Sequence, residues 1–361
     1  MKKVILLAPT PPPAGGIAGW TARMLKAKLK NGWQVEVVDE KSIGNREVFG
    51  ESGKRHFAEE ISRSFQIWKK LKESLRDPEA KVVQSCIPAY TFSMLREYVC
   101  ALITKQKKRK FIVHFRCTVP NAIVHRYEKF ILKRLCNISD MVFSLNRQSK
   151  EMLCELTKTP VRIIPNFISE DELVLDRNIN DELRTIIYVG GIVENKGIRE
   201  IINVAEKIPD IQFLLIGKGD SIFEEEAKRR EIANVVFSGG KDHETVKKEL
   251  LKADAFIFLT HFRGEGFSNS LCEAMAAGLP CIVTDWAANR DMIGEEGGIV
   301  ISSIGDIDTV VSAIQSIRNR DVRVNMSKRN IQKVKADYIE SAVIKQYIDS
   351  YEELIGKNLI E

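Results

Sequence analysis

Residues 263–284 read RGEGFSNSLCEAMAAGLPCIVT, and the expectations for the whole chain start from this stretch. An apolar run at 255–259 precedes it, so the order is a strand, a polar turn, a helix and a second apolar strand. Ser270 and Glu273 have the spacing of a capping box, and a Gly-Leu-Pro sequence ends the helix. The stretch therefore predicts a strand–helix–strand unit of a parallel α/β sheet.

Two carboxylates in this stretch are separated by seven residues. Glu265 lies on the turn beside Gly264 and Gly266, which allow a tight bend, and Glu273 lies in the first turn of the predicted helix. Ligands of open parallel sheets bind at the carboxyl ends of the strands, and a helix N-terminus favours anions and hydroxyls. The pair therefore predicts a ligand site. The alternative is that Glu273 only closes its own helix while Glu265 is a solvated loop acid.

These residues resemble the Glu-x7-Glu motif of the retaining glycosyltransferases of family four. The chain has Glu-Gly-Phe-Ser from Glu265 and Glu-Ala-Met-Ala-Ala-Gly-Leu-Pro from Glu273, where the family has Glu-Gly-Phe-Gly and Glu-Ala-Met-Ala-x-Gly-x-Pro. The resemblance implies an α/β fold with two Rossmann-like doubly wound domains, called GT-B, and an interdomain cleft. It implies an acceptor-side domain over 1–168, a nucleotide-sugar donor-binding domain over 169–340, and a C-terminal helix over 341–361 that returns to the first domain.

The chain opens with a buried strand, a glycine loop and a helix. The strand is expected at 4–8 and the helix at 20–30, with Gly15 and Gly16 in the loop between them. Their spacing is not that of the dinucleotide-binding fingerprint. The family has a Gly-Gly loop at this place, and the resemblance implies that Gly15 and Gly16 face the donor diphosphate. A plain strand-to-helix turn is the alternative.

A second opening of the same kind follows a predicted strand at 185–189. The loop reads GGIVENKG over 190–197, and the family has Gly-Arg, a few residues and Lys-Gly there. In the family the arginine and the lysine clamp the diphosphate through charge-assisted hydrogen bonds. Lys196 matches the lysine, whereas Gly191 stands where the arginine would be, and Arg263 is a candidate for the missing charge. A solvated loop lysine is the alternative reading of Lys196.

The resemblance assigns the remaining roles. Glu273 is expected to bind the ribose hydroxyls, and Glu265 to contact the sugar together with backbone N–H groups of the turn. The catalytic candidates are Glu265 and Lys196. The donor-binding candidates are Gly15, Gly16, Gly191, Lys196, Gly266, Phe267, Ser268, Asn269 and Glu273. His114 and Arg116, at the end of a strand predicted at 111–115, are candidates for a further sugar contact, and the sequence does not decide between them.

Composition narrows the class of ligand and compartment. The net charge of +6 suits anionic ligands or an acidic membrane surface, but it is too small to indicate nucleic acid. Seven cysteines without a Cys-x-x-Cys pair argue against a zinc site or a disulfide framework and favour the cytoplasm. The resemblance implies that Lys196, the glycine loop and a helix N-terminus stabilise the departing diphosphate, so we expect no metal and no cofactor.

The expected partners follow from the resemblance and from two charged segments. They are a nucleotide-sugar donor and a saccharide or lipid-linked acceptor, as in the synthesis of a bacterial surface polysaccharide or glycolipid. The amphipathic segment 51–76 is expected to pack on the core. The basic run 105–110 is expected to be the solvated end of a helix. Both also allow peripheral contact with an anionic membrane, at its inner face.

Two other functions remain open from the sequence. One is a nucleotide-sugar epimerase or hydrolase on the same fold. The other is a non-catalytic subunit that binds the nucleotide sugar for a partner transferase, and Gly191 is the residue that keeps this alternative open. The sequence names neither the sugar and base of the donor nor the acceptor.

Overall fold

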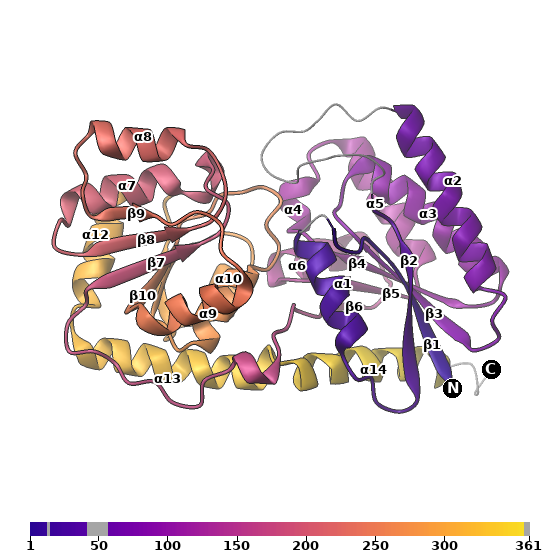
Figure 1. Ribbon diagram of the computed structural model, residues 1–361. Coiled ribbons are helices and arrows are strands. Elements are labelled where there is room, and N and C mark those ends of the chain that lie inside the picture. Colours follow the sequence, from indigo (N-terminus) through magenta and orange to yellow (C-terminus); the bar gives the residue numbers. More distant parts are fainter. Residues whose placement is uncertain (13–14, 42–56, 357–361) are drawn as a thin grey trace. The chain divides into compact units, whose positions relative to one another are not determined.

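The computed structural model describes residues 1–12, 15–41 and 57–356. The chain forms two compact units, one made of Met1–Asn166 with Val343–Glu361 and the other of Phe167–Ala342. Each unit is an α/β domain built on a six-stranded parallel sheet (Figure 1). The expectation of two Rossmann-like α/β domains is therefore confirmed, and each unit is described below by itself.

The sheet of the first unit has the strand order β2-β1-β3-β4-β5-β6. Its strands are β1 (Lys2–Ala8), β2 (Trp33–Asp39), β3 (Ala80–Ile87), β4 (Lys110–Phe115), β5 (Met141–Ser144) and β6 (Val161–Ile163). The apolar run of β1 is completely buried, as expected for a central strand covered by helices on both faces. Since β2 and β3 lie on opposite sides of β1, the carboxyl ends of β1 and β3 flank the point at which the strand order reverses.

The helices of this unit are α1 (Gly16–Lys26), α2 (Phe57–Ser74), α3 (Thr91–Gln106), α4 (Val119–Ala122), α5 (Arg126–Ile138), α6 (Arg147–Leu156) and α14 (Glu340–Gly356). The expectation of a first helix at 20–30 is wrong by four residues, because extended Gly15 already accepts the N–H of Gly19 and starts the helix early. Of the amphipathic segment 51–76, residues 51–56 lie outside the described residues. The rest is mostly α2, which buries Ile67 and Leu71.

The C-terminal helix α14 packs on the first unit, as expected. Its Tyr351 hydroxyl donates to Gln84 Oε1 at 2.6 Å, and its Glu352 forms an ion pair with Lys2. Both tyrosines of the helix, Tyr347 and Tyr351, are fully buried. The last helix of the chain is thus part of the core that its first strands form.

The sheet of the second unit has the order β12-β11-β10-β7-β8-β9. Its strands are β7 (Thr185–Val189), β8 (Gln212–Ile216), β9 (Val235–Phe237), β10 (Ala255–Phe258), β11 (Cys281–Thr284) and β12 (Gly298–Ile301). The chain runs outward from β7 to β9 and then returns to the other side of β7. The neighbouring carboxyl ends of β7 and β10 therefore form a topological switch point, the usual ligand site of an open parallel sheet.

The connections of the second unit are α7 (Ile198–Lys207), α8 (Ile222–Arg229), α9 (His243–Lys252), α10 (Asn269–Ala276), α11 (Asn289–Ile293), α12 (Ile307–Ser316) and α13 (Arg320–Asp337). Two short 3-10 helices, η1 (Glu170–Glu172) and η2 (Glu194–Lys196), lie at the start of the unit and after β7. In the described part of the chain, every helix is too short or too polar to cross a membrane.

Candidate functional site

The two residues expected to be catalytic meet at the switch point of the second sheet. Lys196 Nζ, on the loop after β7, forms an ion pair with Glu265 Oε2, on the loop after β10. The two side chains are only 18% and 12% exposed. The lysine nitrogen also lies 4.7 Å from the centre of the Phe262 ring. The structure therefore places one partly buried cation and one carboxylate together at the expected edge of the sheet.

Gly197 makes this close approach of the two loops feasible. Its φ angle is +78°, and a Cβ atom there would lie 2.4 Å from the carbonyl oxygen of Leu259 at the end of β10. A larger residue would be strained in the backbone and would push the two loops apart. The glycine after Lys196 thus fixes the lysine against the loop that carries Glu265.

A buried tyrosine that the sequence analysis missed supports the same loop. The hydroxyl of Tyr188, on β7, donates to the carbonyl of Gly191 at 2.8 Å. Burial first, and the negative charge of Glu265 second, raise the pKa of Tyr188, so the hydroxyl stays protonated and remains a donor. The sequence does not indicate this role, because a tyrosine in an apolar strand cannot be distinguished from any other aromatic residue that packs in the core.

The expected capping box at Ser270 is wrong. Helix α10 begins at Asn269, and its N-cap is Ser268, whose Oγ accepts the N–H of Leu271 at 3.2 Å. Because the extended Ser268 already caps the helix, Ser270 lies inside it, and Glu273 is the fifth residue of the helix rather than the third. The Phe267 side chain is 6% exposed and packs edge-on against Tyr338, so its ring belongs to the core of the second unit.

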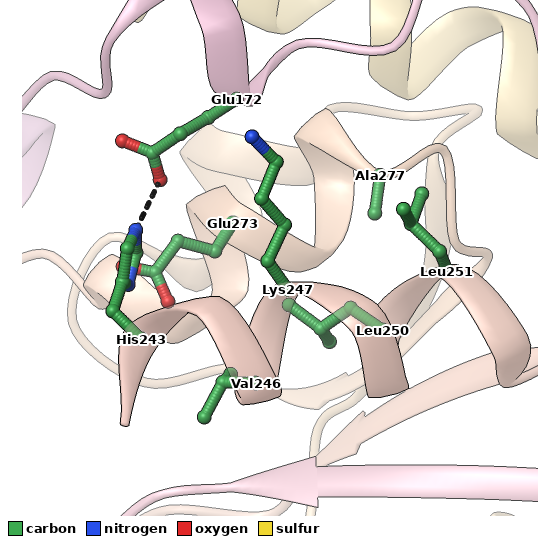
Figure 2. A pocket seen from close by; sticks show the side chains of 8 residues that line it. All are labelled: Glu172, His243, Val246, Lys247, Leu250, Leu251, Glu273 and Ala277. Atoms are coloured by element: carbon green, nitrogen blue, oxygen red, sulfur yellow. Dashed lines mark ion pairs between the residues drawn. The ribbon is translucent and has the colours of Figure 1, made fainter. Parts of the chain in front are cut away.

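Glu273 lines a small pocket between α9 and α10 (Figure 2). Glu172 reaches it from η1, and His243 reaches it from the start of α9, with 3.3 Å between His243 Nε2 and Glu172 Oε2. Among the described residues, these three have ligand atoms within 4.8 Å of one another and could hold a metal ion. Sequence reasoning missed Glu172 and His243, because they come from separate segments and neither belongs to a motif.

The other expected site residues lie at the carboxyl edge of the first sheet. Gly15 and Gly16 form the start of α1, which follows β1. His114 is completely buried on β4, and burial first and the charge of Arg116 second hold the pKa of His114 well below its usual range. Arg116, just past the end of β4, is 7% exposed. The neutral imidazole is thus a core residue, and Arg116 lies nearer the edge at which ligands bind.

The expected residues therefore form two groups, one on each unit. Lys196, Glu265 and Glu273 lie at the edge of the second sheet, together with Gly191 and the residues from Gly266 to Asn269 that lead into α10. Gly15, Gly16, His114 and Arg116 lie at the edge of the first sheet.

The sequence comparisons find matches for the second unit. Residues 169–334 match the family model described as glycosyl transferases group 1. A 2-deoxystreptamine N-acetyl-D-glucosaminyltransferase of Niallia circulans is 26% identical over 46% of this chain and 45% of its own length. A phosphatidyl-myo-inositol mannosyltransferase of Mycolicibacterium smegmatis is 27% identical over 49% and 47%, respectively. The chain thus spans about half the length of the curated relatives it matches.

Solved structures match both units. A sucrose-phosphate synthase from Thermosynechococcus elongatus has a TM-score of 0.78 at 18% identity, covering 99% of this chain and 100% of the other. Anabaena HepE in complex with UDP has a TM-score of 0.71 at 11% identity, covering 98% and 100%. At this level of identity the likeness shows the fold alone. The chain therefore has the GT-B fold, and residues 169–334 carry the sequence pattern of the group 1 glycosyl transferases.

Proposed function

We propose that the chain is a retaining glycosyltransferase that moves a sugar from a nucleotide-sugar donor to an acceptor. The observation that carries this proposal is the Lys196–Glu265 pair at the switch point of the second sheet. This sheet belongs to the segment that matches the group 1 glycosyl transferases. The solved neighbour with bound UDP supports a nucleoside-diphosphate donor.

We propose separate roles for Lys196 and Glu265. A departing nucleoside diphosphate gains negative charge, and a fixed cation in a partly buried site stabilises that charge. Lys196 would bind the diphosphate, while the Glu265 carboxylate would accept hydrogen bonds from the sugar hydroxyls. The N-terminus of α10 adds backbone N–H donors from Gly266 to Asn269.

Glu273 would bind the ribose. Its carboxylate faces the pocket that Glu172 and His243 share. A carboxylate accepts hydrogen bonds from two vicinal hydroxyls, and such charge-assisted bonds are the stronger ones. We also propose that the acceptor attacks the sugar from the front face, beside the leaving phosphate. The leaving phosphate then acts as the base, and the transfer needs no metal.

The acceptor is proposed to be a saccharide or a lipid-linked saccharide of a bacterial surface polymer, or a glycolipid. The mannosyltransferase named above acts on an inositol lipid according to its name. A groove of about 550 Å³ between α2 and α3 is lined by apolar residues that include Phe65, Trp68 and Leu102, together with Lys69 and Lys72. Apolar and cationic side chains on one surface would suit peripheral contact with an anionic membrane at its inner face.

A thermal-shift screen of the full chain against UDP-, GDP- and ADP-sugars tests the donor. A donor at one hundred times its Kd stabilises the folded chain by about 2.7 kcal/mol, which a melting curve detects. The stabilising donor is then incubated with candidate acceptors, with and without EDTA, and the product anomer is assigned by NMR. Transfer with retention and without EDTA sensitivity is the expected result.

Other products would point to the other functions. Release of free sugar in the absence of any acceptor would indicate a hydrolase rather than a transferase. Formation of an epimer under the same conditions would indicate an epimerase. Transferases usually hydrolyse their donor slowly when no acceptor is present. A chain that binds the donor without transferring or hydrolysing it would favour the non-catalytic subunit. Inversion at the anomeric carbon would contradict the proposed mechanism.

A further inference from the structure

Five carboxyl side chains are buried among the residues that the structure describes, namely Glu40, Glu60, Glu97, Glu226 and Asp254. Glu60 forms an ion pair with Arg63, and Glu226 forms ion pairs with two arginines. Asp254 accepts two backbone N–H groups and the side-chain amide of Asn180. Glu40 and Glu97 differ from these three, because both pair with the same arginine, Arg96.

This cluster of three residues carries more negative than positive charge if both acids are ionised. Glu40 follows β2 directly, and Arg96 and Glu97 lie in the second turn of α3. The guanidinium lies 2.8 Å from Glu40 Oε2 and 2.6 Å from Glu97 Oε1. Glu40 and Glu97 are only 2% and 0% exposed. A buried charge without a counter-charge is unfavourable, so burial favours one neutral carboxyl in this cluster.

Each of the two acids also has one buried oxygen that lacks a hydrogen-bond donor. These atoms are Glu40 Oε1 and Glu97 Oε2, and no described residue donates to either of them. Ionised carboxylate oxygens only accept hydrogen bonds, so two of them cannot satisfy each other. The side chain of Glu97 is nevertheless close enough to that of Glu40 for a hydrogen bond. One proton between the two carboxyls would supply the missing donor.

In the described part of the chain, the neighbouring elements do not supply the missing positive charge. Arg63 of α2 also attracts the Glu40 carboxylate, but it forms its ion pair with Glu60. The thiols of Cys86 on β3 and Cys100 on α3 are buried, and burial raises the pKa of both, so they remain neutral. Two arginines therefore face three acids, and the excess of one carboxyl persists.

We propose that Glu40 and Glu97 hold one proton between them in the folded chain at neutral pH, and that loss of this proton at alkaline pH destabilises the first unit. With the proton in place, the pair presents one negative charge, which Arg96 neutralises. The end of β2 lies at the carboxyl edge of the first sheet, where ligands of parallel sheets bind, so this edge would respond to pH. The inference does not depend on the proposed function.

The expected pH dependence follows from the raised pKa of Glu40. Burial first, and then the charge of Glu97 and a hydrogen bond to it, raise this pKa well above its usual value of 4.5, against the opposing charge of Arg96. Above the usual value the unfolded chain has lost the proton while the folded chain keeps it. The stability that the proton provides is therefore complete at low pH and falls as the pH rises. The equilibrium constant of unfolding should rise about tenfold per pH unit from this site, until the folded pair also releases its proton.

Urea unfolding of the full chain at about pH 5 and about pH 9 tests this effect. Tryptophan fluorescence follows mainly the first unit, because Trp20, Trp33 and Trp68 lie in it, and circular dichroism follows both units. Glu40→Gln keeps the shape of a protonated carboxyl but cannot lose a proton. We expect its unfolding constant to equal that of the wild type at about pH 5 and to be at least about tenfold lower at about pH 9. Glu97→Gln is a second variant with the same expected result.

Glu226→Gln, in the second unit, is the matched control. This buried glutamate is paired with two arginines, so the substitution should make the chain less stable than the wild type at about pH 9. Lower stability of Glu40→Gln and Glu97→Gln at about pH 9, as in this control, would show that both acids are ionised and would overturn the proposal.

Infrared spectroscopy detects the proton directly. At about pH 7 exposed carboxyls are ionised, and a protonated carboxyl has a C=O stretching band apart from the carboxylate bands. We expect such a band in the wild type and in Glu226→Gln, and its loss in Glu40→Gln and Glu97→Gln. A wild-type spectrum without this band at about pH 7 would also overturn the proposal.

Discussion

At the scale of single residues, the ion pair between Lys196 and Glu265 is the centre of the candidate site. Both residues were expected from the sequence, because their motifs are continuous and each follows a predicted strand. Their contact was not, since it depends on the neighbouring positions of β7 and β10 in the sheet. Glu172, His243 and Tyr188 were not predicted at all, because a single residue without a motif has no signature in one sequence.

Lys196→Ala is expected to lower kcat by about ten- to a hundredfold, because a fixed cation near the leaving diphosphate contributes a few kcal/mol in the transition state. The conservative Lys196→Arg should retain part of this activity. Initial rates at saturating donor measure the effect. Turnover of Lys196→Ala at the wild-type rate would mean that the leaving group is stabilised elsewhere.

Glu273→Ala is expected to raise the donor KM by roughly ten- to a hundredfold, which corresponds to the loss of about 1.5–3 kcal/mol of charge-assisted hydrogen bonding. The exposed Glu244, next to His243 on α9, provides the control: Glu244→Ala should leave the KM unchanged. Titration of each variant with the nucleoside diphosphate measures the binding step directly. Equal affinities of Glu273→Ala and wild type would exclude the ribose role.

At the scale of elements, the strands follow from buried apolar runs, but the helix starts do not. In SNSL, residues 268–271, both serines are acceptable N-caps by sequence. The choice depends on which serine has an extended backbone, and the structure gives that conformation to Ser268. The same ambiguity shifted the expected start of α1, because glycine caps a helix without any side-chain signal.

Ser268→Ala is expected to destabilise the chain by about 1 kcal/mol, since it removes the acceptor for the N–H of Leu271. Ser270→Ala, two residues further on, should cost less, because this residue lies inside the helix, where alanine is favoured. Urea unfolding of both variants gives the comparison. A larger loss for Ser270→Ala would contradict the assigned start of α10.

At the scale of the whole chain, the return of the last helix to the first unit was expected only from the family resemblance. Nothing in the amphipathic pattern of α14 says which unit it covers. The contacts of α14 show that it covers the first unit, because Tyr347 lies against His114 and Tyr351 donates a hydrogen bond to Gln84. In each contact the tyrosine and its partner are more than two hundred positions apart in the chain. A single sequence carries no signal for such pairs.

Tyr351→Ala tests whether this packing stabilises the first unit alone. Removing a buried aromatic ring costs about 3–5 kcal/mol, and Tyr351 is fully buried among residues of the first unit. Hydrogen exchange should then lose protection in β1 to β6 and keep it in β7 to β12, whereas Tyr338→Ala in the second unit should do the reverse. Equal loss in both sheets after Tyr351→Ala would show that the two units unfold as one, and that α14 stabilises more than the sheet it contacts.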